Sequence, residues 1–197
     1  MLWARIAELP LRVDEISLAP LDLLTSSGWT RRSTVVRIRG DGLEGRGEDV
    51  CYEADDQRAF RRVRDLSALV GGGTFVAFLE RLDGIDPFPK PPSRQENRSY
   101  RRWAFESAAL DLALRQSERS LAQLLERDVA RVEFVASLGL GSPATTAPLE
   151  AWLARVPSLR FKIDFAEDWN EGTIRDLARL GSRIAVVDFK AHYHGSF

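Results

Sequence analysis

Lysine is rare in this chain of 197 residues, and its positions mark where proton-transfer chemistry is favoured. Of the 28 basic residues 25 are Arg, and the three lysines are Lys90, Lys162 and Lys190. Arginine stays charged, whereas burial or a neighbouring charge can adjust lysine into a proton-transfer group. Each lysine is therefore a candidate acid or base.

Two of these lysines lie in segments with the alternation of a strand. Period 2 places Arg160, Lys162 and Asp164 on one face of the first segment, and Asp188 and Lys190 on one face of the second. Sites in α/β barrels and open sheets form at the C-terminal ends of parallel strands. The pattern predicts such a site, although it equally suits Lys–Asp salt bridges near solvent.

After about residue 130, the segments that contain these residues alternate between predicted strands and predicted helices. The predicted strands cover 131–138, 158–165 and 183–189, and the predicted helices cover 147–155 and 171–180. Strands that alternate with helices of about ten residues indicate βαβ units and a parallel sheet.

The first 130 residues instead predict an α+β fold with an antiparallel start. We expect a strand over 1–13, a loop over 16–29 and a hairpin over 33–50 that turns at Gly40-Asp41-Gly42. Further predictions are helices over 55–70 and 73–82 separated by a turn at 71–73, a connector over 86–92, and a short helix over 121–125.

A long helix is predicted from a capping box at Ser93–Glu96 to about Arg115. Its predicted inner face carries Trp103, Ala104, Ser107, Leu110 and Leu114.

Composition excludes several classes of protein. With 29 acidic and 28 basic residues the net charge is −1, which argues against a nucleic-acid partner. No apolar run approaches the ~20 residues of a membrane helix, and charges in the first dozen residues break any signal-peptide core. The single cysteine, Cys51, excludes an internal disulfide and fits a cytoplasmic location. We therefore expect neither a membrane nor a nucleic acid as partner.

Several stretches together resemble the mandelate racemase/muconate lactonizing branch of the enolase superfamily. Residues 25–50 are similar to its capping-domain hairpin, with 45–48 as its Gly-x-Gly-Glu run, and 101–126 resemble the helix that leads into its barrel. Residues 160–162 resemble its Lys-x-Lys motif, and 188–190 its Asp-x-Asn motif.

The resemblance implies an α+β capping domain (1–130) followed by an incomplete α/β (β/α)₈ barrel, its first three βα units (131–197). Lys162 would move a proton α to a carboxylate, with Arg160 in place of the first motif lysine. Asp188 would be a ligand of Mg²⁺, which stabilises the enediolate of a small carboxylate substrate. Lys190, in place of the motif Asn, would contact that substrate.

In a fold of this family, the loops over 16–29 and 50–56 would close over the site. Ser26, Trp29 and Tyr52 are then candidate substrate-binding residues. Ordinary loop packing is the alternative role for these three side chains.

A lysine that acts as base near neutral pH needs a pKa of roughly 7–8, compared with about 10.4 for the free side chain. The Arg160 cation on the same face would lower the pKa of Lys162 in the required direction. Pairing with Asp164 would raise it and weaken the role of base.

A complete (β/α)₈ barrel needs ~250 residues, and only about 67 follow residue 130. The resemblance therefore implies a truncated or split racemase, cycloisomerase or dehydratase that is inactive alone. Its third strand would leave an open edge, which invites a second copy or a complementing chain.

Two other functions stay open from the sequence. Residues 139–144 (GLGSPA), with Asp164 after the next strand, imitate the Rossmann dinucleotide-binding fingerprint, although Pro143 interrupts the turn. A non-catalytic interaction domain is the third hypothesis. His192 and His194 are weaker candidates for a transition-metal site.

Overall fold

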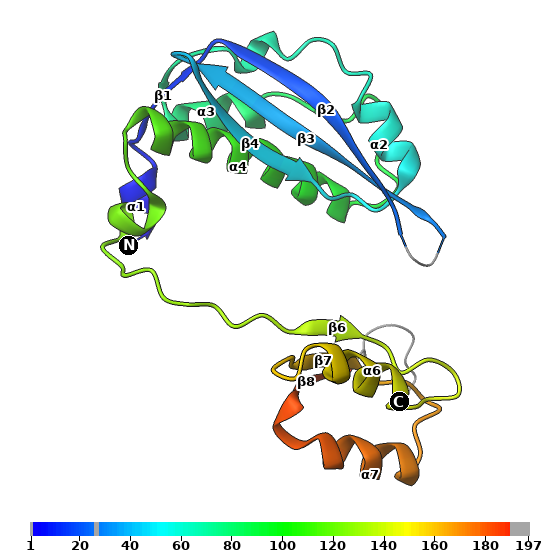
Figure 1. Ribbon diagram of the computed structural model, residues 1–197. Helices are drawn as coiled ribbons and strands as arrows, with labels where there is room; N and C mark the ends of the chain where they lie inside the picture. Colours follow the sequence, from blue (N-terminus) through cyan, green and yellow to red (C-terminus); the bar gives the residue numbers. More distant parts are fainter. Residues whose placement is uncertain (1, 26–27, 190–197) are drawn as a thin grey trace. The chain divides into compact units, whose positions relative to one another are not determined.

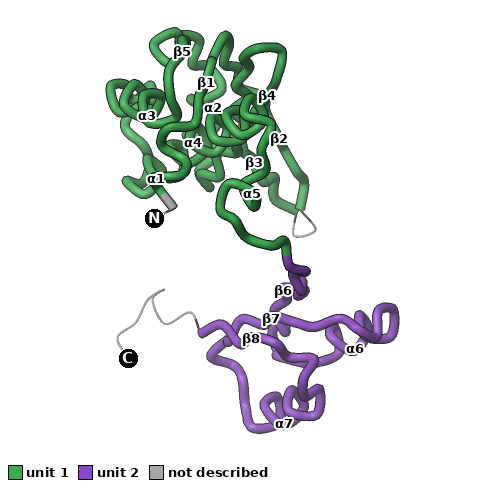
Figure 2. The backbone as a smooth tube through the Cα atoms, turned by 90° about the vertical axis from the view of Figure 1, so that its left-hand side faces the viewer, with its two compact units in different colours: residues 1–129 green, residues 130–197 purple. Residues whose placement is uncertain are grey.

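The computed structural model describes residues 2–25 and 28–189. The chain forms two compact units, Met1–Val129 (unit 1) and Ala130–Phe197 (unit 2), which Figure 2 shows in separate colours. Each unit is described by itself. Within the described ranges, no helix combines the length and the apolar character needed to cross a membrane.

Unit 1 is built on an antiparallel sheet with the strand order β2-β3-β4 (Figure 1). Strands β3 (Thr30–Gly40) and β4 (Leu43–Asp49) form the predicted hairpin. The backbone of Asp41 (φ 52°) and Gly42 (φ 74°) is left-handed at both turn residues. This is the geometry of a two-residue type I′ turn, for which Asp-Gly is a preferred sequence.

Strand β2 (Glu15–Leu24) occupies most of the segment predicted to be a loop, and that prediction was wrong. It pairs with β3 along its whole length, with Pro20 opposite Thr34. A proline is tolerated because β2 is the edge strand and needs no N–H donor toward solvent. The exposed leucines at the end of β2, Leu21, Leu23 and Leu24, hide the alternation that would have indicated a strand.

Helix α4 (Glu96–Gln116) runs along one face of this sheet (Figure 1). Two glycines of β4 allow the close approach. A Cβ atom on Gly45 would lie 2.2 Å from the carbonyl oxygen of Ala108, and one on Gly47 would lie 2.0 Å from that of Ala104. Only glycine fits at these positions, because any side chain would collide with the helix backbone.

The predicted inner face of α4 is confirmed in part, because Ala104 is buried and Leu110 and Leu114 pack partly buried against the core, whereas Ser107 is exposed. Trp103 is 62% exposed, and the face against the sheet includes Ala104, Phe105, Ala108 and Leu112. The contact with the backbone at Gly45 and Gly47 favours small residues on the helix, which a large tryptophan does not fit.

The predicted capping box of α4 does not form. The backbone N–H and the hydroxyl of Ser93 donate to the carboxylate of Asp56 at 2.9 and 3.0 Å, and Gln95 caps the helix without a side-chain bond. A capping box does occur at Ser120 and Gln123, where α5 (Leu121–Leu125) begins as predicted. The long-range bond to Asp56 thus replaces the local cap.

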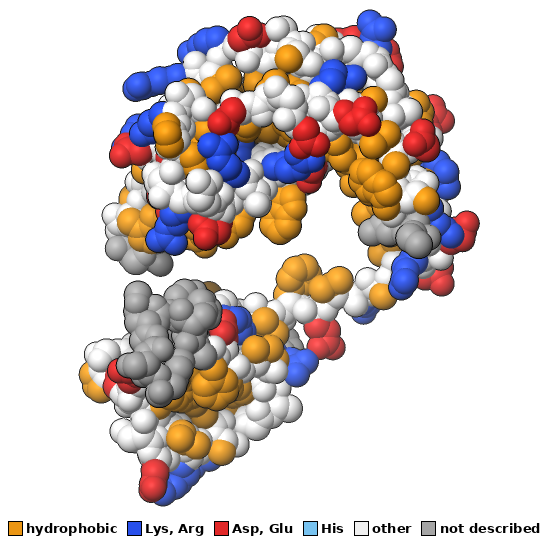
Figure 3. Space-filling model, turned by 180° about the vertical axis from the view of Figure 1, so that it is seen from behind, with side chains coloured by type: hydrophobic (Ala, Val, Ile, Leu, Met, Phe, Trp, Pro, Cys, Tyr) orange, Lys and Arg blue, Asp and Glu red, His pale blue; other side chains and the backbone are white. Residues whose placement is uncertain are grey.

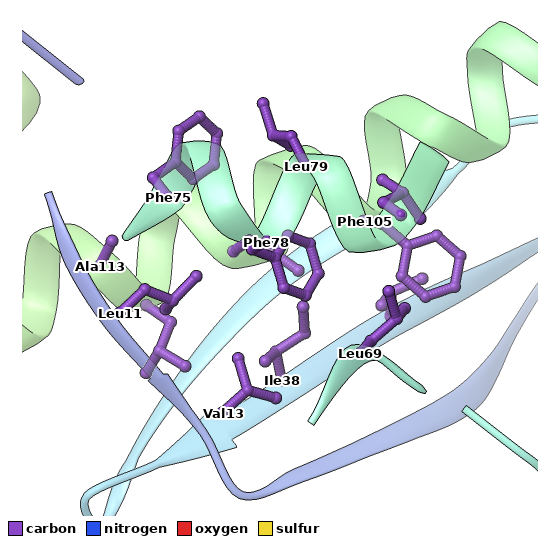
Figure 4. Packing of buried hydrophobic residues seen from close by; sticks show 14 of the residues in the cluster. Leu11, Val13, Ile38, Leu69, Phe75, Phe78, Leu79, Phe105 and Ala113 are labelled. Carbon is purple, nitrogen blue, oxygen red and sulfur yellow. The ribbon is translucent and has the colours of Figure 1, made fainter. Parts of the chain in front are cut away.

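The other elements of unit 1 close its core. They are α1 (Leu2–Ile6), β1 (Pro10–Val13), α2 (Ala54–Phe60), the 3₁₀ turn η1 (Ser67–Leu69), β5 (Gly71–Thr74) and α3 (Phe75–Asp83). Figure 4 shows Val13, Ile38 and Phe78 pointing toward one another beneath α3.

Three predictions fail in this region of unit 1. The predicted N-terminal strand is a short helix followed by β1, and the predicted helix over 55–70 ends at Phe60. The glycine run predicted to be a turn is strand β5, which pairs antiparallel with β1. Glycine has no side chain, so a run of glycines cannot show the alternation of apolar and polar residues that indicates a strand.

Unit 2 contains the predicted parallel sheet, in the order β6-β7-β8. Its elements are β6 (Ala136–Leu138), α6 (Ala147–Arg155), β7 (Phe161–Asp164), α7 (Glu171–Leu180), the 3₁₀ turn η2 (Gly181–Arg183) and β8 (Ile184–Asp188). The two helices match their predicted bounds. Strand β6 is shorter than predicted, and Val132 and Phe134 before it are 73% and 87% exposed.

Acidic and basic side chains are interspersed on the face of unit 1 seen in Figure 3. Surface ion pairs of unit 1 include those of Arg39 with Glu44 and of Arg115 with Asp111. This visible face therefore presents charges of both signs.

Candidate functional site

The two faces of the unit 2 sheet differ in character. Phe161 and Ile163 of β7 are fully buried in a core that also contains Leu149 of α6 and Leu177 of α7. Both helices therefore cover the same face of the sheet. Alternation places Lys162 and Asp164 on the opposite face, as the sequence predicted.

On this second face, one lysine lies between two aspartates. Lys162 Nζ lies 2.5 Å from Asp164 Oδ1 and 2.6 Å from Asp188 Oδ2. Asp164 and Asp188 are paired in register as the last residues of β7 and β8. The three side chains form what we call the strand-end cluster. The cluster lies at the C-terminal ends of parallel strands, where this class of fold places its active sites.

The charges of the strand-end cluster hold the lysine in its ammonium form. The hydrogen bonds to Asp164 and then to Asp188 raise the pKa of Lys162 above its ordinary value, and partial burial offsets this only in part. The Lys162 side chain is 27% exposed. The expectation that Arg160 lowers this pKa was wrong, and the alternative, pairing with Asp164, describes the structure.

Arg160 points its guanidinium toward other partners. Its Nη1 donates to Glu133 at 2.7 Å, and its Nε donates to the carbonyl oxygen of Ser182 at 3.2 Å. The residue precedes β7, so it lies toward the opposite end of the strand from Asp164. The structure thus brings Lys162 and Asp188 together and directs Arg160 elsewhere.

Ser137 of β6 is a site neighbour that the sequence analysis did not single out. It is paired in register with Lys162, so its side chain belongs to the same face of the sheet. The polar residue between Ala136 and Leu138 was the available signal.

Trp29 and Tyr52, two of the predicted substrate-binding residues, lie near the end of the β2–β3 hairpin where a turn joins the two strands. Trp29 is 46% exposed, and its carbonyl oxygen accepts from the backbone N–H of Thr25 at 2.9 Å. Tyr52 is 69% exposed, and the guanidinium of Arg31 stacks 4.1 Å from the centre of its ring. Both side chains are accessible, as a binding role requires.

Some predicted residues cannot be compared with the structure. Ser26 and Lys190, together with His192 and His194, lie outside the described residues.

The donor set around Asp188 does not fit Mg²⁺ within the described part of the chain. Mg²⁺ prefers six oxygen ligands in octahedral geometry. The strand-end cluster offers two carboxylates, and both are bound to the Lys162 ammonium. The described residues contain no group of three or more His, Cys, Asp or Glu side chains arranged to hold a metal.

The glycine-rich loop after β6 does not have the geometry of a dinucleotide site. Helix α6 begins only at Ala147, so residues 142–146 separate it from the glycines of the loop. A Rossmann fingerprint instead places its glycine turn directly at the start of the helix, where the backbone N–H groups meet the pyrophosphate. Asp164, the expected ribose ligand, is bound to Lys162.

Two family descriptions match the sequence. "Domain of unknown function (DUF8230) N-terminal domain" matches residues 4–124, and "Domain of unknown function (DUF8230) C-terminal domain" matches residues 128–197. No curated protein matches the chain in sequence.

Solved structures share the fold at low sequence identity. The muconate lactonizing enzyme from Pseudomonas putida is 21% identical, with a TM-score of 0.61 over 92% of this chain and 53% of the enzyme. A mandelate racemase/muconate lactonizing protein from Herpetosiphon aurantiacus is 19% identical, with a TM-score of 0.62 over 91% and 53%.

A third solved structure, of a protein from Roseovarius nubinhibens ISM described as belonging to the same group, is complexed with magnesium. It is 19% identical, with a TM-score of 0.55 over 83% of this chain and 45% of that protein. The chain spans about half the length of these solved structures. The resemblance to this branch of the enolase superfamily is thus confirmed as a resemblance of fold. The chain belongs to the DUF8230 family, and its fold is a partial form of the mandelate racemase/muconate lactonizing enzyme fold.

Proposed function

We propose that the strand-end cluster is one side of an acid/base site for proton transfer at the carbon α to a carboxylate. The observation that carries the proposal is the 2.6 Å contact between Lys162 Nζ and Asp188 Oδ2 across neighbouring parallel strands. It joins a proton-carrying group and an anchoring carboxylate on the face that the helices leave uncovered. The shared fold supports this chemistry, because enzymes with such folds place their reacting groups at strand ends.

Lys162 carries its proton while both aspartates bind it, so in this arrangement it is a proton donor. The ammonium can deliver that proton to a carbanion, and the Nζ electron pair then remains on the nitrogen. Acting as base requires the reverse step, in which neutral Nζ takes the α proton and the C–H electrons enter the enediolate. Releasing one aspartate would lower the pKa of Lys162 toward the range of a base.

The reaction class is racemisation, cycloisomerisation or β-elimination of a small carboxylate. A protein that shares this fold is complexed with magnesium, an ion that in enzymes stabilises developing negative charge. The described residues do not supply its ligand set. We therefore expect a polypeptide of residues 1–197 to turn over no substrate alone.

Solvent deuterium exchange tests the proposal. A chimera would join residues 1–189 to the remaining barrel of the Pseudomonas putida enzyme, and ²H incorporation α to the carboxylate would be followed in a panel of small carboxylic acids. We expect exchange in the chimera and its loss in Lys162→Ala, with Lys90→Ala as the matched control. Equal exchange in the chimera and its Lys162→Ala variant would refute the role of Lys162.

A second candidate function, an interaction surface, is favoured by an apolar cavity on the helix side of the sheet. This cavity of about 400 Å³ lies between α7 and β8. We call it the α7–β8 groove, and its lining includes Ile163, Phe165, Trp169, Ile174, Val187 and Phe189. Strand β8 is the last strand in the described sheet order, so its outer edge is open to a further strand. The proposed occupant of the α7–β8 groove is a second copy of the chain, which a measurement of self-association tests directly.

A further inference from the structure

We propose that the Lys162 ammonium takes the place of a bound cation between Asp164 and Asp188, and that it thereby excludes a divalent metal ion from these two carboxylates. This inference concerns cation binding alone, so it stands or falls independently of the proposed acid/base chemistry.

The geometry of the three side chains is the first argument. The ammonium lies 2.5 Å from one carboxylate and 2.6 Å from the other, so it occupies the position between them. A cation that bridged the same two oxygens, Oδ1 of Asp164 and Oδ2 of Asp188, would have to take that position. Ammonium and metal ion are therefore alternatives at this place.

The arrangement of the backbone is the second argument. Asp164 and Asp188 are register partners on neighbouring strands, and Lys162 is two residues before Asp164 on the same face. The register shifts between Phe161 and Lys162, and from Lys162 onward the pairing is regular, so that all three side chains are aimed at one point. Each strand contributes an aspartate at its last residue, so the meeting of the three groups follows from strand pairing.

The balance of charge is the third argument. Two carboxylates and one ammonium leave the cluster with a single negative charge. A divalent ion would be repelled by the ammonium at close range, and it would lack the oxygen ligands that Mg²⁺ requires. The described residues offer no third acidic or imidazole side chain to complete a metal site. The chain thus departs at this point from the metal ligand that the motif resemblance implies for Asp188.

Binding of Mn²⁺, followed by the EPR signal of the free ion, tests the proposal on the chain of residues 1–197. We expect no binding that depends on Asp188 in the unaltered chain. In Lys162→Met the two carboxylates lose their internal cation, so the affinity for Mn²⁺ should rise at least about tenfold. The double variant Lys162→Met/Asp188→Asn should lose this gain, and Lys90→Met, which removes a lysine elsewhere, should show none.

Two results would overturn the proposal. The first is Mn²⁺ binding by the unaltered chain that Asp188→Asn abolishes. The second is a Lys162→Met variant with native circular dichroism and no gain in Mn²⁺ affinity.

If Lys162→Met does not fold, paramagnetic NMR on the unaltered chain decides the question. The proposal predicts that Mn²⁺ broadens the Lys162 side-chain signals no more than those of Lys90. Selective broadening at Lys162 would contradict it.

Discussion

Lys162 Nζ and a carboxylate oxygen of Asp188 lie 2.6 Å apart on neighbouring parallel strands of unit 2. Asp164 binds the same ammonium from its own strand. The lysine is thereby held as a cation on the face of the sheet that α6 and α7 do not cover.

The first prediction concerns the protonation of Lys162. Its pKa is higher in the folded chain than in the unfolded one, because Asp164 and Asp188 bind the ammonium. The contribution of this pairing to the stability of unit 2 is small because the side chains are partly exposed. It is present in full below the unfolded pKa and disappears as the pH rises through the folded pKa.

Amine acetylation followed by mass spectrometry measures this protection. At about pH 9, below the ordinary lysine pKa near 10.4, Lys162 should react slowly. Its acetylation should accelerate in Asp164→Asn and in Asp188→Asn, while Lys90 serves as an internal reference for the reagent. Unchanged acetylation of Lys162 in both variants would contradict the assigned cause of the pKa shift.

The second prediction concerns the contact between β4 and α4. Gly47→Ala places a Cβ 2.0 Å from the carbonyl oxygen of Ala104, so strand and helix must separate. We expect a loss of roughly 1–3 kcal/mol or more in the free energy of unfolding, measured by urea denaturation. Gly72→Ala is the matched control, because a Cβ at that position meets no atom within 4 Å. Equal stability of the two variants would refute the proposed close packing.

The third prediction concerns a buried arginine in unit 1. Arg101 is fully buried between the rings of Phe60 and Phe88, and its Nε donates to Asp49 at 2.8 Å. Arg101→Met leaves the Asp49 carboxylate buried without a counter-charge, which should cost about 3–5 kcal/mol of stability.

The adjacent Arg102 provides the control for this measurement. It is 37% exposed and pairs with Asp83 and Glu106 at the surface. Arg102→Met should therefore cost only about 0–1 kcal/mol. Similar losses of stability in Arg101→Met and Arg102→Met would show that burial does not determine how much an ion pair contributes to the stability of unit 1.

The fourth prediction concerns the α7–β8 groove. If a second copy occupies it, residues 1–197 should self-associate with increasing concentration in sedimentation velocity. Phe189→Lys, which alters a groove residue that is 65% exposed, should shift the chain toward monomer. The control Trp103→Lys alters an aromatic residue of similar exposure in unit 1 and should have no effect. A chain that stays monomeric at all concentrations would refute this occupant.

Sequence patterns predicted unit 2 better than unit 1, and the reason is the range of the interactions. Helices α5, α6 and α7 match their predicted bounds because caps and apolar periodicity are local signals. Strand β2 was missed because it is defined by its pairing with β3. Trp103 was wrongly placed on the inner face of α4 because that face depends on glycines about 60 residues earlier in the chain.

The sequence likewise predicted part of the candidate site, namely which side chains share a face of the sheet. Period 2 placed Lys162 and Asp164 on one face, and the order of the strands brought Asp188 beside them. Alternation could not show that Arg160 binds Glu133, because that contact depends on how the chain before β6 folds back toward β7. The direction of the Lys162 pKa shift likewise required knowledge of both of its partners.

The partial exposure of the three charged side chains at the strand ends has a consequence for mutagenesis. Water screens ion pairs that it can reach, and such pairs contribute little to folding. Exchanging these side chains should leave unit 2 almost as stable as before. Any change in ligand binding or turnover caused by such variants can then be attributed to the lost groups themselves, without correction for unfolded protein.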